Sequence, residues 1–413
     1  MRRRELLLGA AALPMVRARA AAPARVVVVG GGYGGATAAK YLRLFSGGAI
    51  EVVLVEPEEA FVSCPMSNLV LAGRWQMSDI TRSLQGLTSR HGVRIVRDRA
   101  TAIDVERRQL RLARGDAIAY DKLILSPGID MNWSEVEGLE AARSRVLQAW
   151  KAGPETAALR RQLEAMPDGG VFAIAIPEAP YRCPPGPYER ACLVADWMRE
   201  AKPKAKLLIL DANPDVTSKG PLFKKVWAEQ HAGRIEYRPQ NKLTAIDGDT
   251  LKFEFADDVH ADVINALPPM RAGAIAVDAG LANSNGRWCQ VKYQNFASTA
   301  APHIHVIGDA IQIANAMPKS GHMANAQAKV AAAAITAELS GMEIDPAPML
   351  MNTCYSFTDA RNAVHVASVH EYVAAEATFK PVAGAGGLSA APNELEARYA
   401  FNWARTIWDD VLG

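Results

Sequence analysis

The 413-residue sequence predicts an α/β protein built from two similar strand–turn–helix units and a C-terminal α+β segment. Three observations lead to this prediction. The valine run "RVVVVG" enters a glycine-rich turn and an alanine-rich helix, a second such pattern begins at "GGVFAIAIPEAP", and a later strand ends in "HVIGDA". Continuous apolar runs of this length are typical of parallel strands buried on both faces. The chain is long enough for two or three domains with their own cores.

The first unit has the spacing of a dinucleotide-binding turn. Gly30, Gly32 and Gly35 fit the pattern G-x-G-x-x-G directly after the valine strand. Glycines there permit a tight turn and let the backbone approach a pyrophosphate at the helix N-terminus. The next strand ends at Glu56, where a carboxylate can bind a ribose hydroxyl; the alternative is a solvated strand-end acid. We therefore predict a Rossmann-like dinucleotide-binding domain.

Two later strands favour FAD over NAD in this site. "YDKLILSPGID" is a strand that ends at Ser126 and Gly128, and "TAAPHIHVIGDA" is a strand that ends at Gly308 and Asp309. In order and spacing, these segments resemble the two-domain, glutathione-reductase-like flavin disulfide reductases. That resemblance implies that Asp309 binds the ribityl chain of FAD.

The second unit has the strands of a nucleotide fold but not its glycine turn. The turn reads "PEAPYRCPPGPYERA", with one glycine and four prolines before the predicted helix. Proline has no N–H to offer a phosphate. We expect that this unit keeps its fold without an NAD(P)H site, so electrons arrive from another donor.

The first 20 residues resemble an export signal of the twin-arginine type. They hold five arginines and one glutamate, then an apolar run at 6–15 and the small-residue pattern "ARA". The alternative is a basic N-terminus without this role. Export predicts a periplasmic protein, where disulfides persist. The rest of the chain has 41 basic and 43 acidic residues, which does not favour nucleic acid, and no segment predicts a transmembrane anchor.

The predicted organisation after the signal has three parts. Residues 21–155 and 275–338 form the FAD-binding domain, 156–274 the second nucleotide-fold domain, and 339–413 a C-terminal interface domain. In "MPKSGHMANAQAK", Lys319 and His322 are expected near the flavin edge, where they can stabilise charge. The last helix repeats apolar residues every four positions, which predicts either core packing or a docking surface: Tyr399, Trp403, Ile407 and Val411.

The five cysteines have no zinc-site spacing, and no metal site is predicted. Cys64 lies eight residues after Glu56, so the chain that follows the ribose can bring its thiol to the isoalloxazine ring. It has no neighbouring cysteine for a local disulfide. Its thiolate can instead form a permanent thioether with the 8α-methyl carbon of FAD.

The export signal and the motifs "SCPMSN", "PYRCPPGPYERA", "MPKSGHMANAQAK" and "NTCYSF" together resemble the flavoprotein subunit of flavocytochrome c sulfide dehydrogenase. The resemblance implies an 8α-S-cysteinyl FAD at Cys64 and a redox-active disulfide between Cys183 and Cys354. The alternative for that pair is a structural staple. Cys192 and Cys289 match no family role and are expected to be buried and inert.

The resemblance implies that hydrosulfide opens the disulfide by thiol–disulfide exchange and that the electrons reach FAD. The chain contains no C-x-x-C-H, so the haem is expected on a c-type cytochrome partner in a heterodimer. Two alternatives remain: a sulfide:quinone oxidoreductase, and a non-catalytic flavoprotein that activates a sulfur-oxidising complex. The sequence does not decide which cysteine hydrosulfide attacks.

Overall fold

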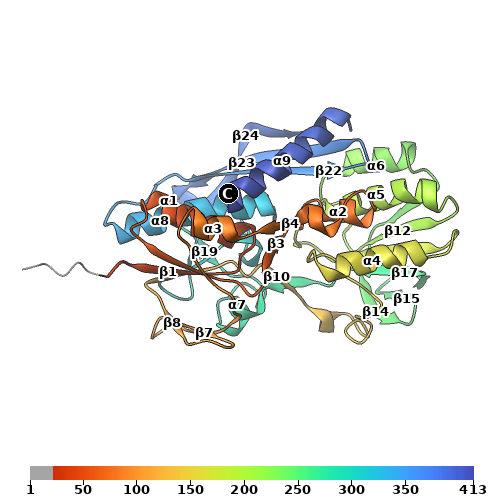
Figure 1. Cartoon of the computed structure of the whole chain (residues 1–413). Helices are drawn as coiled ribbons and strands as arrows, with labels where there is room; N and C mark the ends of the chain where they lie inside the picture. The colour runs from red at the N-terminus through yellow and green to blue at the C-terminus, as the bar shows by residue number, and fades with distance from the viewer. Residues whose placement is uncertain (1–21) are drawn as a thin grey trace, which may run out of the picture.

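The structure is a computed structural model that describes residues 22–413. The predicted export signal at 1–20 therefore lies outside the described residues. Figure 1 shows two α/β units side by side, with the C-terminal segment lying over both. Among residues 22–413, no helix is long and apolar enough to span a bilayer.

A seven-stranded sheet forms the first unit, in the order β19-β20-β21-β9-β1-β2-β5. Its five strands from β21 to β5 run parallel, and β20 and β19 extend one edge antiparallel. Val26, Val27 and Val28 are completely buried because helices and loops cover both faces. The strands are β1 Arg25–Val29, β2 Glu51–Val55, β5 Arg94–Val96, β9 Lys122–Leu125, β19 Val291–Lys292, β20 Ala297–Ser298 and β21 Ile304–Val306.

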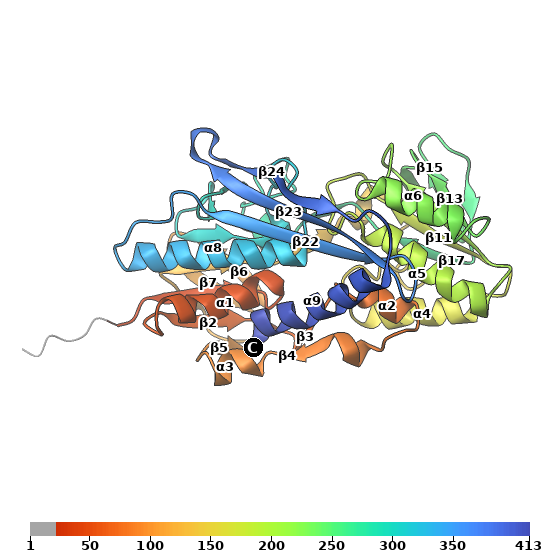
Figure 2. The same cartoon turned by 90° about the horizontal axis from the view of Figure 1, so that it is seen from above.

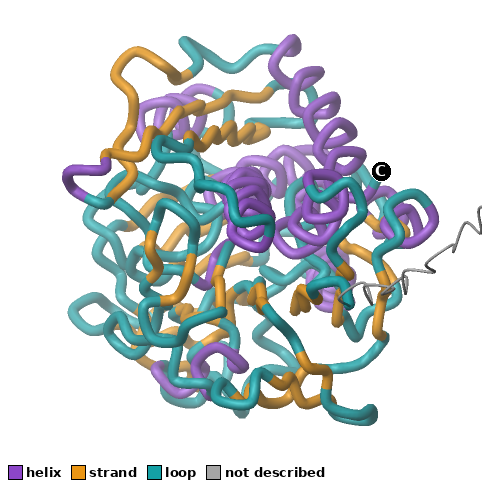
Figure 3. Tube along the Cα trace, turned by 90° about the vertical axis from the view of Figure 1, so that its left-hand side faces the viewer, coloured by secondary structure: helices purple, strands orange, loops and turns teal. Residues whose placement is uncertain are grey.

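Two long helices, α1 (Tyr33–Phe45) and α8 (Gly321–Leu339), pack against each other beside this sheet. Their contact faces are rich in glycine and alanine, which lets the helices approach closely. The Asn325 amide donates a hydrogen bond to the Thr37 hydroxyl across the contact at 3.0 Å. Figure 3 shows these helices between the sheet and the C-terminal strands. This arrangement directs the N-termini of both helices towards the second unit.

The second unit is a parallel sheet in the order β13-β12-β11-β17. Val136, Leu139 and Val146 pack in its core, together with a small antiparallel sheet, β14–β16. The strands β10 (Ile129–Met131) and β18 (Met270–Ala272) pair where the chain passes between the units. The elements are α4 Pro154–Ala165, β11 Val171–Ile176, α5 Gly186–Ala201, β12 Lys206–Asp211, α6 Gly220–Glu229, β13 Ile235–Arg238, β14 Leu243–Asp247, β15 Thr250–Phe253, β16 Val259–His260 and β17 Val263–Ala266.

The C-terminal segment is an antiparallel sheet, β22-β23-β24, followed by α9. Its bounds are β22 Met349–Phe357, β23 Ala363–Val373, β24 Thr378–Leu388 and α9 Glu394–Leu412. Figure 2 shows β22 running from α8 towards α5, and both helices contact this strand. This strand therefore contacts both units, α8 in the first and α5 in the second. The positions of the predicted domain boundaries remain predictions.

The last helix is anchored on the first unit rather than free. Lys40 donates hydrogen bonds to the carbonyls of Asp409 and Asp410 at 3.1 and 3.0 Å, where helix carbonyls favour a cation. Ile407 and Val411 are buried, Trp403 is half-buried and Tyr399 is exposed. The C-terminal half of the helix therefore packs in the core, as the first of the two interpretations expects.

The remaining α-helices and strands are short. They are β3 Ala60–Val62 with β4 Thr81–Ser83, α2 Ser67–Leu71, α3 Gln85–Ser89, the sheet of β6 Ala100–Asp104, β7 Gln109–Leu112 and β8 Ile118–Ala119, and α7 Ala274–Asp278.

Candidate active site

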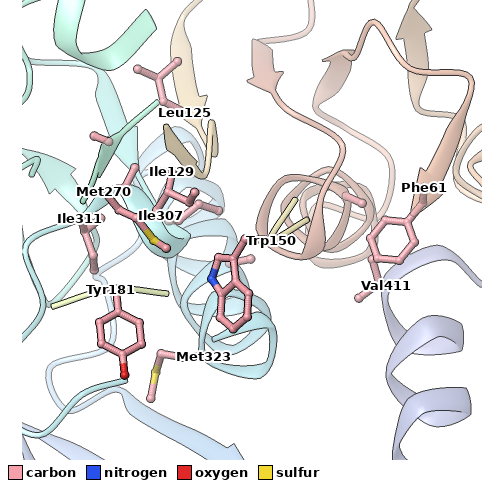
Figure 4. Close-up of a cluster of buried hydrophobic side chains, with 14 of the residues drawn as sticks. Phe61, Leu125, Ile129, Trp150, Tyr181, Met270, Ile307, Ile311, Met323 and Val411 are labelled. Atoms are coloured by element: carbon pink, nitrogen blue, oxygen red, sulfur yellow. The ribbon is translucent and has the colours of Figure 1, made fainter. Parts of the chain in front are cut away.

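A cavity lies where the two units and the C-terminal segment meet. Its lining comes from the glycine turn, the segment after β3, the proline-rich turn, β22 and α9. Phe61 and Trp150 belong both to this lining and to the large core cluster of Figure 4, so packed side chains bound the cavity. The lining residues that the sequence predicted are Gly32, Cys64, Ser126, Gly128, Cys183, Gly308, Asp309, His322 and Cys354.

The glycine turn is closed on one side and open on the other. A Cβ on Gly35 would lie 1.8 Å from the Gly30 carbonyl oxygen, and one on Gly30, where φ is +94°, would lie 2.4 Å from the Ser126 carbonyl oxygen. A Cβ on Gly32 would meet nothing within 4 Å. Glycine is therefore required at positions 30 and 35 for β1 and α1 to pack closely. Space remains at Gly32, before the N-terminus of α1, and a helix N-terminus favours an anion.

Glu56 lies at the end of β2, beside this turn. Its carboxylate accepts hydrogen bonds from the backbone N–H of Gly31 at 2.5 Å and of Glu58 at 2.8 Å. These bonds hold the carboxylate where the acid of a dinucleotide fold meets a ribose. Glu56 is near the cavity without being part of its lining.

Asp309 lines the cavity and has an unpartnered side-chain oxygen. Its Oδ1 is buried and has no hydrogen-bond partner among residues 22–413. Burial raises the pKa of this carboxyl, and the nearby charges of Arg182 and Lys319 oppose that effect. A buried acceptor without a donor is unfavourable, so this site suits a ligand that supplies hydroxyl donors.

Cys64 enters the cavity from the segment after β3. The backbone N–H of Ala152 donates a hydrogen bond to its sulfur at 3.5 Å, and the Arg182 guanidinium is near enough to interact with it electrostatically. The sulfur therefore lies between polar donors at the cavity wall. This is the end of the cavity that adjoins the proline-rich turn.

Cys183 and Cys354 are 171 positions apart in the sequence and line the same cavity. Cys183 is held in a left-handed conformation, with φ at +58°, and its N–H donates to the Lys319 carbonyl at 2.8 Å. Burial raises the pKa of the Cys183 thiol to about 12; Cys354 adds to this effect, while Arg182 and Lys219 oppose it. Both cysteines are free thiols in the structure. The fold thus brings the predicted pair together without a bond between them.

Lys319 and His322 have different positions. The Lys319 ammonium does not line the cavity: it donates to the carbonyls of Asp309 and Ile311 at 2.8 and 2.6 Å and lies 3.6 Å from the centre of the Trp288 ring. Burial lowers its pKa to about 7. His322 does line the cavity, and its Nδ1 accepts the Thr353 N–H at 2.9 Å. The lysine side chain is therefore held outside the cavity lining, whereas His322 lies within it, and the proximity of both to the flavin edge remains a prediction.

Four charged residues near the cysteines were missed by the sequence analysis: Arg182, Glu189, Arg190 and Lys219. Glu189 lines the cavity and accepts hydrogen bonds from the Phe357 N–H and the Asn68 amide, both at 2.9 Å. Burial raises the pKa of its carboxyl. Three of the four lie in "PYRCPPGPYERA", where charges beside a cysteine in an apolar turn are a usable signal. Lys219 has no comparable signal.

The other two cysteines lie outside the cavity. Cys192 is buried in α5 and accepts the Trp227 indole N–H at 3.3 Å, while Cys289 is buried close to Lys319. Burial raises the pKa of both thiols. Within residues 22–413, no group of three or more His, Cys, Asp or Glu side chains is arranged to hold a metal ion.

Comparison with known families places three matches along the chain. Residues 24–161 match the pyridine nucleotide-disulphide oxidoreductases. Residues 156–268 match the central part of the sulfide dehydrogenase [flavocytochrome c] flavoprotein chain, and residues 346–412 match the flavin-binding part of flavocytochrome c sulphide dehydrogenase. Together, the three matches extend over most of the described chain.

Individual relatives agree with these matches. A 46-residue stretch is 65% identical to the flavoprotein chain of sulfide dehydrogenase from Chlorobaculum thiosulfatiphilum, covering 94% of that sequence and 11% of this chain. The mitochondrial sulfide:quinone oxidoreductase of Mus musculus is 24% identical over 69% of this chain; this chain spans 65% of its length. The sulfide:quinone oxidoreductase structure from Aquifex aeolicus shares the fold, with a TM-score of 0.79, 18% identity, and coverage of 94% of this chain and 91% of that one.

Proposed function

Because this chain belongs to the flavoprotein chains of flavocytochrome c sulfide dehydrogenase, an FAD-binding family of two-dinucleotide-domain oxidoreductases, we propose that it oxidises hydrosulfide and passes the electrons to a c-type cytochrome. The observation that carries the proposal is the shared cavity. It joins a dinucleotide-binding turn to two cysteines from distant parts of the chain. Oxidation of a small sulfur nucleophile by a disulfide beside a flavin needs these components in one place.

The chain's own residues fit FAD. The N-terminus of α1 behind Gly32 suits the pyrophosphate, Glu56 suits the ribose, and the unpartnered Asp309 oxygen suits the ribityl hydroxyls. We assign covalent attachment to Cys64, whose sulfur lines the same cavity. When bound, FAD accepts two electrons and can pass them on one at a time.

The proposed chemistry of the protein begins at Cys183 and Cys354 as a disulfide. The sulfur of hydrosulfide attacks one cysteine sulfur, the bond between the two cysteines breaks, and the other cysteine leaves as a thiolate. The attacked cysteine then carries the added sulfur as a persulfide. The pair has thereby accepted the two electrons of the substrate.

The acceptor is assigned to a partner chain. No cysteine of this sequence begins a C-x-x-C-H haem-attachment motif. A one-electron haem acceptor matches the ability of FAD to release electrons singly. We propose a heterodimer with a c-type cytochrome in the periplasm, in agreement with the basic and apolar start of the chain.

Steady-state kinetics test this proposal against its alternatives. Purified protein with its cytochrome is expected to reduce cytochrome c when sulfide is added. Rapid reduction of a quinone, with none of cytochrome c, would instead favour a sulfide:quinone oxidoreductase. Absence of sulfide-dependent flavin reduction would favour a non-catalytic flavoprotein that activates a sulfur-oxidising complex.

NADH and NADPH are expected not to reduce the bound flavin at a useful rate. In the second unit, Asp211 ends β12 as Glu56 ends β2, but it is completely buried. Its carboxylate accepts hydrogen bonds from Tyr188 at 2.6 Å, Asn213 at 2.7 Å and Tyr237 at 3.3 Å. The carboxylate that would bind a nucleotide ribose is therefore already hydrogen-bonded to protein side chains and is not accessible to a ligand. Anaerobic stopped-flow mixing measures the rate, with dithionite as the positive control, and rapid bleaching by NADH would contradict the expectation.

Glu189 lines the cavity with the two cysteines, and we assign it as the base that takes up the proton of the substrate. Replacing Glu189 with glutamine is expected to lower kcat/KM for sulfide by roughly 100-fold, the usual effect of losing a general base. Because burial raises the pKa of this carboxyl, its carboxylate form, which takes up the substrate proton, accumulates only above the ordinary range of glutamate. Activity of the unmodified protein should fall as pH falls through the raised pKa, and Glu189→Gln should lose this dependence. Glu200→Gln, an exposed position on α5, is the matched control. An unchanged pH profile in Glu189→Gln would exclude this role.

A further inference from the structure

Lys219 is a buried lysine that is bound to the segment carrying Cys354. Its ammonium donates hydrogen bonds to the Cys354 carbonyl and to the Ser356 hydroxyl, both at 2.7 Å. Lys219 lies at the N-terminus of α6 in the second unit, and only 6% of its surface is exposed. The side chain therefore ties β22 to the second unit at the position of the redox cysteine.

The backbone of Lys219 is in the left-handed region, with φ at +60°. This conformation is uncommon for a residue with a Cβ and favours glycine or asparagine. Lysine has a less favourable backbone energy than glycine in this conformation. The hydrogen bonds of its ammonium with Cys354 and Ser356 are contacts that glycine could not make.

The charge of Lys219 also reaches the sulfurs. Burial lowers the pKa of its ammonium, and the negative charges of Cys354, Glu189 and Cys183 oppose that effect and favour the charged form. Cys183 in turn interacts with Arg182, Lys219 and Glu189. Among these cations, Lys219 is the one that hydrogen-bonds the backbone of a redox cysteine.

We propose that Lys219 is a positioning residue that makes the Cys183–Cys354 disulfide a stronger electron acceptor, by holding the Cys354 segment and by stabilising the negative charge that opening of the bond leaves on sulfur. This inference rests on the proposed function, because it takes the disulfide as the first acceptor of electrons. It assigns to the two cysteines a positively charged partner, Lys219, that is not itself part of the cavity lining.

The charge balance of the reaction gives the direction of the effect. The disulfide is neutral, whereas attack by hydrosulfide, an anion, leaves one negative charge shared by a persulfide and a thiolate. A buried cation therefore favours the opened state over the closed one. Stabilisation of the reduced form is the physical basis of a strongly oxidising disulfide.

The test is the equilibrium of the pair with glutathione, measured on the flavin-loaded protein. Two glutathione thiols reduce the disulfide to one cysteine thiol and one cysteine thiolate, release a proton and form oxidised glutathione, so two electrons are transferred and one negative charge remains on the pair. Alkylation followed by mass spectrometry gives the reduced fraction of Cys183 and Cys354. The variants are Lys219→Met, which removes hydrogen bonds and charge, Lys219→Gln, which keeps a donor without charge, and Lys219→Arg, which keeps the charge.

We expect Lys219→Met and Lys219→Gln to lower the equilibrium constant for reduction about tenfold, which is about 30 mV for this two-electron couple. Lys219→Arg should recover most of this loss. Lys225→Met removes an exposed lysine of the same helix and should leave the constant unchanged. Melting temperature and bound flavin, measured on every variant, show whether a change arises from unfolding. If Lys219→Met does not fold, Lys219→Gln still tests the effect of removing the charge.

If both uncharged variants have equilibrium constants for reduction within twofold of the value for the unmodified protein, the inference is overturned and the proposed function remains intact. An equal loss in Lys225→Met would also overturn it. If the unmodified protein shows no bond between Cys183 and Cys354 under oxidising conditions, both the inference and the proposed sulfide chemistry fail.

Discussion

Replacing either Cys183 or Cys354 with serine is expected to reduce sulfide-dependent reduction of cytochrome c by roughly 100-fold or more, because each residue is half of one reacting unit. Both side chains lie at the cavity wall, so serine should leave bound FAD and the fold in place. The measurement is steady-state cytochrome c reduction with sulfide as donor. The double variant should be no worse than either single one, since residues that act as a unit are not additive.

A structural staple predicts a different outcome for the same variants. Losing a stabilising disulfide costs about 2–5 kcal/mol of unfolding free energy, and turnover would persist in the protein that remains folded. Denaturant titration beside the kinetic assay separates the two roles. Cys289→Ala, which removes a buried thiol outside the cavity, is the matched control. Full activity in either serine variant, or a peptide map linking Cys183 to Cys192, would defeat the proposed mechanism.

FAD is expected to remain attached to the unmodified protein after acid or heat denaturation, and Cys64→Ala is expected to release it completely or to fail to incorporate it. The reason is the position of the Cys64 sulfur in the cavity that holds the dinucleotide turn. A thioether survives unfolding, whereas every noncovalent contact with the cofactor is lost with the fold. Flavin absorbance of the precipitated and soluble fractions measures the outcome.

Mass spectrometry of the peptide that contains Cys64 locates the bond. Cys183→Ala is the control, because it removes another thiol of the same cavity and should keep the flavin attached. Quantitative release of FAD from the unmodified protein would remove the covalent assignment. It would leave the family and the fold unaffected.

Much of the first unit could be predicted from local sequence. The steric demand of the glycine turn acts between residues that are close in sequence, because Gly35 packs against the Gly30 carbonyl. The ends of adjacent parallel strands meet at one sheet edge, so a strand ending in Gly308 and Asp309 belongs beside the turn. Patterns of this kind are readable because each depends on a few consecutive positions.

The side-chain environment of the site was less predictable. The sequence predicts Lys319 near the flavin edge but does not predict its contacts: its ammonium binds two carbonyls and lies over the Trp288 ring. The direction of a long flexible side chain depends on which acceptors the fold brings near it. The same holds for Asp211, whose tyrosine partners come from α5 and β13.

The α/β class and the glycine turn follow from the sequence alone, because strand periodicity and glycine geometry are properties of short segments. The resemblance of short motifs adds Cys64, Cys183 and Cys354 as predicted site residues. The folded chain is needed to show that Cys183 and Cys354 share a cavity with Glu189 and that Lys219 hydrogen-bonds the Cys354 carbonyl. These residues come from three separate parts of the chain, and their charges interact strongly because folding removes them from water.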